Sequence, residues 1–158
     1  MRVSMQIVGL IVALLVCYAA AGIGSIFTAA AIPSWYNTLP LPPWTPPRWL
    51  FGPVWTLLYT LMAFAAWLVW RKRGFRGAAL PLALFGIQLV LNVLWSVIFF
   101  GLRLPALAFA EIVLLWLAIL ATLIAFWRVT PVAGWLLVPY LLWVSYAAAL
   151  NLAIARGL

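Results

Sequence analysis

Long apolar segments alternate with short polar or proline-containing stretches along this chain. Five of the apolar segments reach the roughly 20 residues that a helix needs to cross about 30 Å of hydrocarbon. The pattern therefore predicts an all-α fold, a bundle of five transmembrane helices forming one integral membrane domain over residues 1–158. The five segments cover about residues 5–30, 50–70, 79–101, 105–127 and 132–154.

The residues between the segments agree with these limits. The basic run Arg71-Lys72-Arg73-Gly74 follows the second segment, and Pro105 and Pro131 occupy the first turns of the fourth and fifth. Proline is tolerated at the start of a helix, because the N–H that it lacks would have no intrahelical partner there. The later connections are short, so consecutive helices are expected to pack as antiparallel neighbours.

Composition supports a membrane protein. Of the 158 residues, 70% are hydrophobic and 6% are charged, whereas soluble domains carry about 25% charged residues. The single cysteine, Cys17, excludes a disulfide within the chain. It recurs with small residues at every fourth position of the first segment, a pattern that fits close helix packing within the bundle or across a dimer. This small-residue stripe consists of Gly9, Ala13, Cys17, Ala21, Ser25 and Ala29.

The charges are unevenly distributed. Nine basic residues against one acidic residue give a net charge of +8. An excess of Lys and Arg marks the cytoplasmic side of a membrane, which predicts the N-terminus inside. Basic residues that flank a membrane contact anionic head groups and form no extended stripe here, so the expected partner is lipid and not nucleic acid. Arg2, Arg71, Lys72, Arg73, Arg76 and Arg128 fall on the N-terminal side, and Arg48, Arg103 and Arg156 on the other.

The segment between the first two apolar runs, residues 31–49, is dense in proline and tryptophan. Prolines remove backbone donors and clash with preceding carbonyls, so a regular helix is excluded. They also stiffen the chain, while Trp35, Tyr36, Trp44 and Trp49 need apolar surfaces to pack on. We expect a stiff aromatic cap over the mouth of the helical bundle, with the functional site beneath it.

Polar residues line one face of the third segment. Gln88, Asn92 and Ser96 recur at every fourth position, next to Trp95 and Phe99. Amides at membrane depth mark either hydrogen bonds between helices or the wall of a polar cavity. The large aromatic neighbours favour a cavity wall, to which Tyr140, Ser145 and Asn151 of the fifth segment would add polar groups.

Glu111, the only acidic residue, falls inside the fourth segment, eight residues after Arg103. That spacing keeps both side chains near one helix face, so an ion pair is expected, with a proton or substrate site as the alternative. The chain has no histidine and no aspartate. The usual general bases and most transition-metal ligands are therefore missing, and no metal site is expected. A large, flat, apolar ligand with polar edges suits such a chain best.

Several motifs together resemble the TspO/MBR family, which includes tryptophan-rich sensory proteins of bacteria and the mitochondrial translocator protein. The resemblance extends over about residues 20–155. It implies a five-helix bundle, commonly a homodimer, whose ligand pocket is capped by the first loop. The matching motifs are Trp35-Tyr36, Pro42–Pro47, Gly52–Tyr59, Gln88–Asn92, Ile98–Gly101, Pro139–Trp143 and Leu150-Asn151.

The resemblance also implies ligands and contact residues. Family ligands include porphyrins such as protoporphyrin IX and haem, and sterols in mitochondrial members. A lysine of the family pattern is replaced by Leu41, so porphyrin carboxylates are expected to contact Arg48 instead. Gln88 joins the set from the polar face of the third segment. The positions implied by the family are Trp35, Tyr36, Trp44, Pro47, Trp55, Asn92, Trp95, Phe99, Trp143, Ala147 and Leu150.

Three functions remain open on this basis. The first is a membrane receptor or sensor that binds tetrapyrroles or other flat hydrophobic, sterol-like small molecules, without a tightly bound cofactor. The second is a transporter of porphyrin, lipid or sterol across or along the bilayer. The third is an enzyme that breaks down porphyrin in light, with Trp55 and Trp143 as its indoles. The expected location is a bacterial cell membrane, whether inner or outer.

Overall fold

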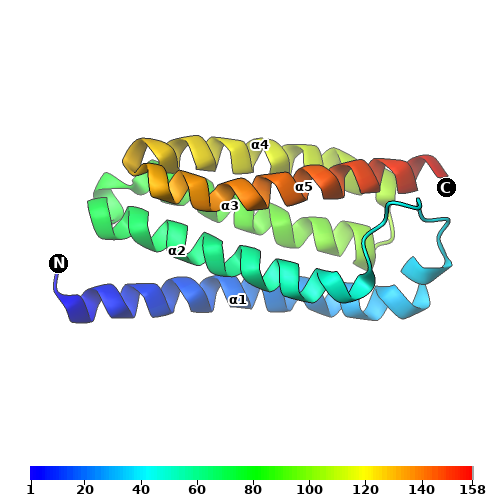
Figure 1. The fold of residues 1–158 in the computed structure, drawn as a ribbon, viewed down its shortest axis with the longest axis horizontal. Helices are drawn as coiled ribbons and strands as arrows, with labels where there is room; N and C mark the ends of the chain where they lie inside the picture. The colour runs from blue at the N-terminus through cyan, green and yellow to red at the C-terminus, as the bar shows by residue number, and fades with distance from the viewer. Residues whose placement is uncertain (158) are drawn as a thin grey trace.

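The computed structural model describes residues 1–157, which form five long helices and contain no β-strand. All five helices are long and apolar enough to cross a membrane, which confirms the expected fold class (Figure 1). The helices are α1 (Val3–Ser34), α2 (Phe51–Gly77), α3 (Ala79–Ser96), α4 (Pro105–Val129) and α5 (Pro131–Gly157). Three short helices, η1 (Tyr36–Thr38), η2 (Arg48–Leu50) and η3 (Val97–Gly101), complete the chain.

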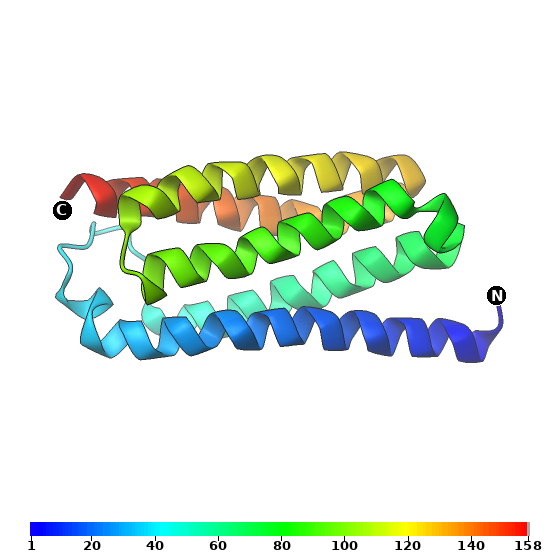
Figure 2. The ribbon, with the colours of Figure 1, turned by 180° about the vertical axis from the view of Figure 1, so that it is seen from behind.

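The helices lie side by side, and each runs opposite to the next along the chain. Figures 1 and 2 show the first loop at the same end of the bundle as the C-terminus, and the turn between α2 and α3 at the end that holds the N-terminus. All six basic residues expected on the N-terminal side lie at that second end, which we call the basic end. Which leaflet it faces stays a prediction from the charge count.

Two helices, α1 and α2, extend beyond the limits expected from the sequence. The second helix does not stop at the basic run but continues to Gly77, with a break at Gly74, where φ is 69°. This left-handed conformation carries no steric penalty for glycine. At the other end, α1 continues to Ser34, so the expected capping loop of residues 31–49 becomes residues 35–50, hereafter the lid.

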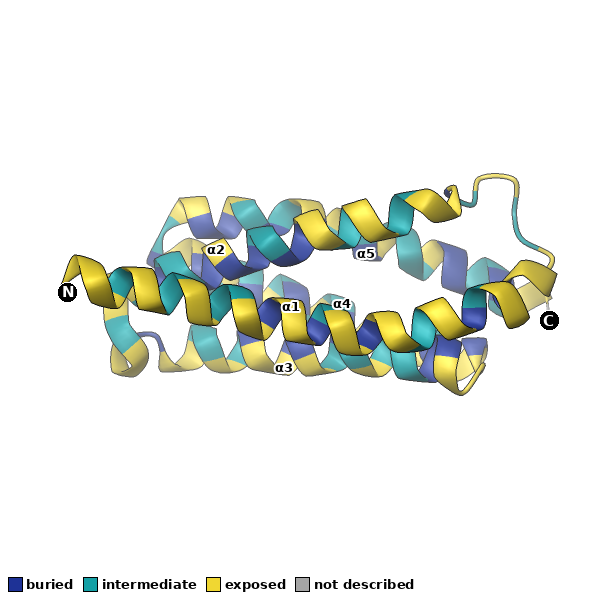
Figure 3. Cartoon of the chain, turned by 90° about the horizontal axis from the view of Figure 1, so that it is seen from below, coloured by how far each residue is buried: buried dark blue, intermediate teal, exposed yellow. Residues whose placement is uncertain are grey.

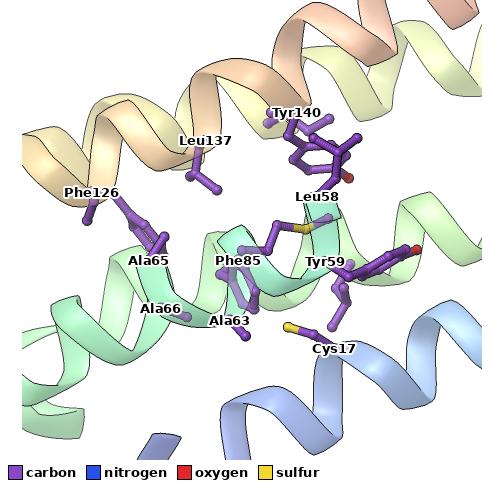
Figure 4. Packing of buried hydrophobic residues seen from close by; sticks show 14 of the residues in the cluster. Cys17, Leu58, Tyr59, Ala63, Ala65, Ala66, Phe85, Phe126, Leu137 and Tyr140 are labelled. Carbon is purple, nitrogen blue, oxygen red and sulfur yellow. The ribbon is translucent and has the colours of Figure 1, made fainter. Parts of the chain in front are cut away.

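The bundle is held together by a core that all five helices share. Phe85 of α3 stacks on Phe126 of α4 with ring centroids 5.8 Å apart. Cys17 of α1 is fully buried and points toward α2 (Figure 4), so it serves as a small packing residue.

The small-residue stripe of α1 faces the bundle along its first half. A Cβ atom at Gly9 would lie 2.1 Å from the Trp70 ring, so the indole packs directly on the helix backbone. Ser25 and Ala29 are exposed instead, because a spacing of four residues drifts around a helix that has 3.6 residues per turn. The rest of α1 is largely exposed (Figure 3), as expected for a helix that faces lipid.

Two basic residues near the end of α2 cap the C-terminus of α4. Lys72 Nζ donates to the Val129 carbonyl at 2.8 Å, and Arg73 Nη2 lies 3.5 Å from the Arg128 carbonyl. These are among the last carbonyls of α4, which have no partner within the helix and carry a partial negative charge. Two cations of the basic run therefore stabilise the end of α4.

The ion pair expected between Arg103 and Glu111 is wrong. Arg103 has a left-handed backbone, with φ 58°, and its Nη2 donates to Ser34 Oγ of α1 at 3.2 Å. Glu111 is buried and has no hydrogen-bond partner among the described residues. Arg103 precedes the first turn of α4, so its side chain is not fixed by the helical spacing on which the expectation relied.

The close packing of α5 on α4 is predicted to depend on Gly134. A Cβ atom there would lie 2.9 Å from Trp127 Cβ and 3.1 Å from its Cα, so Gly134→Ala must push the helices apart. We expect a loss of about 1–3 kcal/mol in the free energy of unfolding, measured by denaturation in detergent. Gly22→Ala is the control, because no atom lies within 4 Å of its added methyl group. Equal stability of the two variants would contradict this packing.

Candidate ligand-binding site beneath the lid

The lid is a short, defined structure and not a flexible loop. Thr45 is folded back on Pro42, whose carbonyl accepts hydrogen bonds from the Thr45 N–H at 3.1 Å and from its hydroxyl at 2.7 Å. Pro47 has an extended backbone and directly precedes η2. The Tyr146 hydroxyl of α5 donates to the Trp44 carbonyl. The lid is thus attached to the helix on the far side of the bundle mouth.

A small cavity of about 60 Å³ lies beneath the lid. Its walls come from the lid and from α1, α2, α3, η3 and α5, so every part of the chain except α4 contributes. Most of the side chains that face it are aromatic. The residues lining this lid cavity are Thr28, Tyr36, Pro46, Phe51, Trp55, Trp95, Ser96, Phe99, Phe100, Trp143, Tyr146, Ala147, Leu150 and Asn151.

The aromatic rings of the lid cavity support one another. Trp95 stacks on Phe99 with centroids 5.1 Å apart and planes at 23°. Trp55 and Trp143 meet edge to face at 6.4 Å and 88°, and Phe51 contacts Trp143 at 6.5 Å. These are the arrangements that aromatic pairs prefer, so the cavity has flat walls held in place by their neighbours.

A π-helical turn, η3, brings two phenylalanines into this wall. Leu102 N–H donates to the Val97 carbonyl five residues earlier, at 2.8 Å, and both Phe99 and Phe100 are buried. Such widened turns are frequent at functional sites. Gly101 is needed here because a Cβ atom would lie 2.8 Å from the Phe27 ring of α1.

Few polar groups face the lid cavity. The Trp95 indole N–H donates to Asn151 Oδ1 at 3.0 Å, and Asn151 Nδ2 donates to the Pro105 carbonyl at 2.8 Å. These two hydrogen bonds fix Trp95 against α5 and the start of α4. The Tyr36 hydroxyl is buried and has no hydrogen-bond partner among the described residues. An unpaired buried hydroxyl costs about 1–3 kcal/mol, so this group is available to a ligand.

The amides of α3 join helices below the cavity. The Tyr59 hydroxyl donates to Asn92 Oδ1 at 2.9 Å, and Asn92 Nδ2 donates to the Tyr140 hydroxyl at 2.6 Å. The Tyr140 hydroxyl in turn donates to Gln88 Oε1 at 2.7 Å. We call these four residues the amide–tyrosine chain. Gln88, expected at the cavity wall, is buried in this joint between α3 and α5 and lines neither the lid cavity nor the neighbouring groove, so its part in ligand binding stays a prediction.

A second space opens beside the lid cavity. This side groove has a volume of about 360 Å³ and is lined by α1, α2, α3 and Arg48 of the lid. Two members of the amide–tyrosine chain, Tyr59 and Asn92, border it. The side groove shares Thr28, Phe51, Trp55 and Ser96 with the lid cavity. The two spaces are therefore neighbours separated by these side chains.

The structure places most of the sequence-predicted residues at these two spaces. Arg48, Trp55 and Asn92 border the side groove. The positions that line the lid cavity are Tyr36, Trp55, Trp95, Phe99, Trp143, Ala147 and Leu150.

Three expected residues of the lid line neither space. Trp35 packs edge-on against Phe99 at 5.6 Å and supports the wall from behind. Trp44 packs on the Tyr146 ring at 5.7 Å, and Pro47 fixes the backbone that enters η2. These residues shape and attach the lid.

The structure also adds residues that sequence reasoning missed. Phe51, Phe100 and Tyr146 all line the lid cavity, as does Pro46. Phe51 begins α2 and Phe100 belongs to the π-helical turn. The only signal for them was their position inside or beside the aromatic motifs, because regular helical spacing would not turn both Phe99 and Phe100 inward.

Comparisons with known proteins agree with this architecture. The sequence profile of the TspO/MBR family matches residues 12–156. The tryptophan-rich protein TspO of Chlorobaculum tepidum is 43% identical over 155 residues, which cover 96% of both chains. The human translocator protein is 40% identical over 136 residues, covering 85% of this chain and 80% of that one. The tryptophan-rich sensory protein of Cereibacter sphaeroides is 42% identical over 122 residues, covering 77% and 75%. This chain therefore belongs to the TspO/MBR family.

Proposed function

We propose that this protein is a membrane receptor that binds flat, largely apolar ligands, tetrapyrroles among them, beneath its lid. The observation that supports this most directly is the lid cavity, in which Trp55, Trp95, Phe99 and Trp143 surround a space with few polar groups. Stacking on such rings adds about 0.5–1.5 kcal/mol per ring pair beyond the burial of area. Four rings together favour a planar ligand over a branched one.

The polar groups at the site match the edges of such a ligand. Tyr36 lines the lid cavity and its hydroxyl is buried without a partner, so a ligand that reaches this group could hydrogen-bond it. Arg48 borders the side groove from the lid and can pair with a carboxylate. A tetrapyrrole presents both features, a flat apolar ring system and acidic side chains at one edge.

The size of the lid cavity requires it to open. Its volume of about 60 Å³ is far below the about 300–1,000 Å³ of small-molecule sites. The side groove adds about 360 Å³ and is separated from the cavity by a few side chains, Phe51 and Trp55 among them. We infer that a ligand dissolved in the bilayer enters through the side groove and displaces these side chains and the lid.

Relatives carry two kinds of name, tryptophan-rich sensory protein and translocator protein. The family thus supports a membrane sensor or translocator role. A sensor needs only a closed binding site, whereas a translocator also needs a path by which its ligand can leave. The side groove could serve as part of such a path, so it favours the translocator as a second candidate. Both functions begin with the same binding step.

Deleting a wall of the lid cavity, or filling its space, is expected to weaken ligand binding. Trp143→Ala deletes a wall and Ala147→Trp fills the space, so each should raise the Kd for protoporphyrin IX at least tenfold in a fluorescence-quenching titration. Their matched controls are Trp135→Ala and Ala121→Trp, which change exposed positions remote from the lid. Binding that is as tight in both test variants as in both controls would refute this site.

Loosening the lid is expected to accelerate ligand exchange. Tyr146→Phe removes the hydrogen bond to the Trp44 carbonyl but keeps the ring contacts. A net hydrogen bond is worth about 1 kcal/mol, so association and dissociation rates for protoporphyrin IX should both rise about fivefold in stopped-flow measurements. The Kd should change little. Tyr18→Phe, which removes a hydroxyl contact to Thr60 away from the lid, is the control. Unchanged rates in Tyr146→Phe would exclude the lid as a gate.

Transfer across the bilayer separates the two candidate functions. A translocator would carry protoporphyrin IX into albumin-loaded proteoliposomes faster than it enters protein-free vesicles. Ser25→Trp narrows the side groove and should abolish that excess. If the excess is zero in the unmodified protein while binding is intact, the receptor function alone stands.

A further inference from the structure

A separate apolar groove lies at the basic end of the bundle, away from the lid. Its volume is about 560 Å³, and it is lined by parts of residues 4–16 of α1, 66–75 of α2 and 82–85 of α3. Figure 2 shows α1 and α3 diverging toward this end, with α2 behind them. Ser4 is the one polar side chain in this lining. We call this space the basic-end groove.

The groove has a defined shape because α1 and α2 are tied together beside it. The Trp67 indole N–H donates to the Gln6 carbonyl at 2.8 Å, and Trp70 rests on the bare backbone at Gly9. The turn at Gly74 places Phe75 against Trp70, with ring centroids 5.9 Å apart. Indoles of this kind gather at the level of the lipid head groups.

Three arginines without a hydrogen-bond or ion-pair partner among the described residues lie at the same end. The Arg71 guanidinium lies 4.5 Å from the centroid of Trp67, which lines the groove. Arg76 follows Phe75 directly, and Arg2 lies two residues before Ser4. The side chains of these three arginines have no hydrogen bond or ion pair to any other described residue, in contrast to Lys72, which caps α4. The only acidic residue of the chain, Glu111, is buried in α4.

We propose that the basic-end groove binds an anionic phospholipid, with one acyl chain along its apolar lining and the phosphate beside Arg71 and Arg76. The lining matches the hydrocarbon chain, and the unpartnered arginines match the charge of the head group. A second copy of this chain suits the groove less well. Two copies inserted in the same orientation would bring their basic ends together, and like charges repel.

This site is independent of the ligand site beneath the lid, which lies at the other end of the helices. It is tested by native mass spectrometry of delipidated full-length protein offered equal amounts of palmitoyl-oleoyl phosphatidylglycerol and phosphatidylcholine. The unmodified protein should retain one phosphatidylglycerol with at least fivefold preference. Arg71→Gln should lower that preference about fivefold, whereas Arg156→Gln, which removes the same charge at the lid end, should leave it unchanged.

A second pair of variants tests whether the acyl chain occupies the groove. Val12 lines the groove and is exposed, whereas Ile11, its neighbour on α1, is equally exposed but lies outside it. Val12→Trp should therefore reduce the retained lipid about tenfold, and Ile11→Trp should not. Far-UV circular dichroism and gel filtration establish that each variant is folded.

Three results would overturn the proposal that the basic-end groove binds an anionic phospholipid. Equal loss of preference in Arg71→Gln and Arg156→Gln would overturn the proposal, because it would reflect net charge and not a site. Retention in Val12→Trp equal to that in Ile11→Trp would overturn it as well. Conversion of a dimer to a monomer by Val12→Trp would identify a second copy as the occupant instead. Even if Val12→Trp fails to fold, the comparison of the two arginine variants decides.

Discussion

The amide–tyrosine chain is the interaction on which the arrangement of this bundle depends. Lipid gives helices no hydrophobic reason to associate, so close packing and polar contacts must hold them together. Tyr59, Asn92, Tyr140 and Gln88 connect α2, α3 and α5 through three hydrogen bonds of 2.6–2.9 Å. Because each hydroxyl and amide in this buried series has a partner, the three helices have one preferred register. These hydrogen bonds therefore fix the floor below the lid cavity.

The lid is attached more lightly than the floor. It has no helix longer than three residues, and its polar attachment to α5 is the Tyr146 hydrogen bond, beside the tilted ring contact of Trp44 and apolar packing near Leu150 and Ile154. Opening it would break few polar contacts and would leave the amide–tyrosine chain intact. A hydrogen-bonded floor beneath a lightly attached cover suits the proposed receptor for membrane-dissolved ligands. Under that proposal, the small volume of the lid cavity belongs to the closed state.

The sequence was sufficient for the fold because lipid leaves few alternatives. A backbone in hydrocarbon must satisfy its own hydrogen bonds, so five long apolar runs could become little other than five helices. The aromatic cap followed from proline and indole chemistry, and the helix limits differed mainly where Gly74 permits a break. Residues that face the cavity from regular helix, such as Trp95 and Trp143, were predictable from motif and spacing.

What escaped prediction depends on departures from regular geometry. Gln88 and Asn92 lie on one helix face, and only the positions of Tyr59 and Tyr140 on other helices decide that Gln88 is a joint and not a wall. Phe100 faces the cavity because η3 is a π-helical turn, which no spacing rule indicates. Arg103 turns to α1 because its backbone is left-handed.

The charge distribution gives the two ends of the bundle different roles. With one buried acid in the whole chain, ion pairs within the protein cannot neutralise the cations, and within residues 1–157 only the Lys72 and Arg73 side chains meet helix carbonyls. The remaining counter-charge comes from outside the protein, and lipid phosphates are one source of it at a membrane surface. The basic end can therefore be anchored by the bilayer itself.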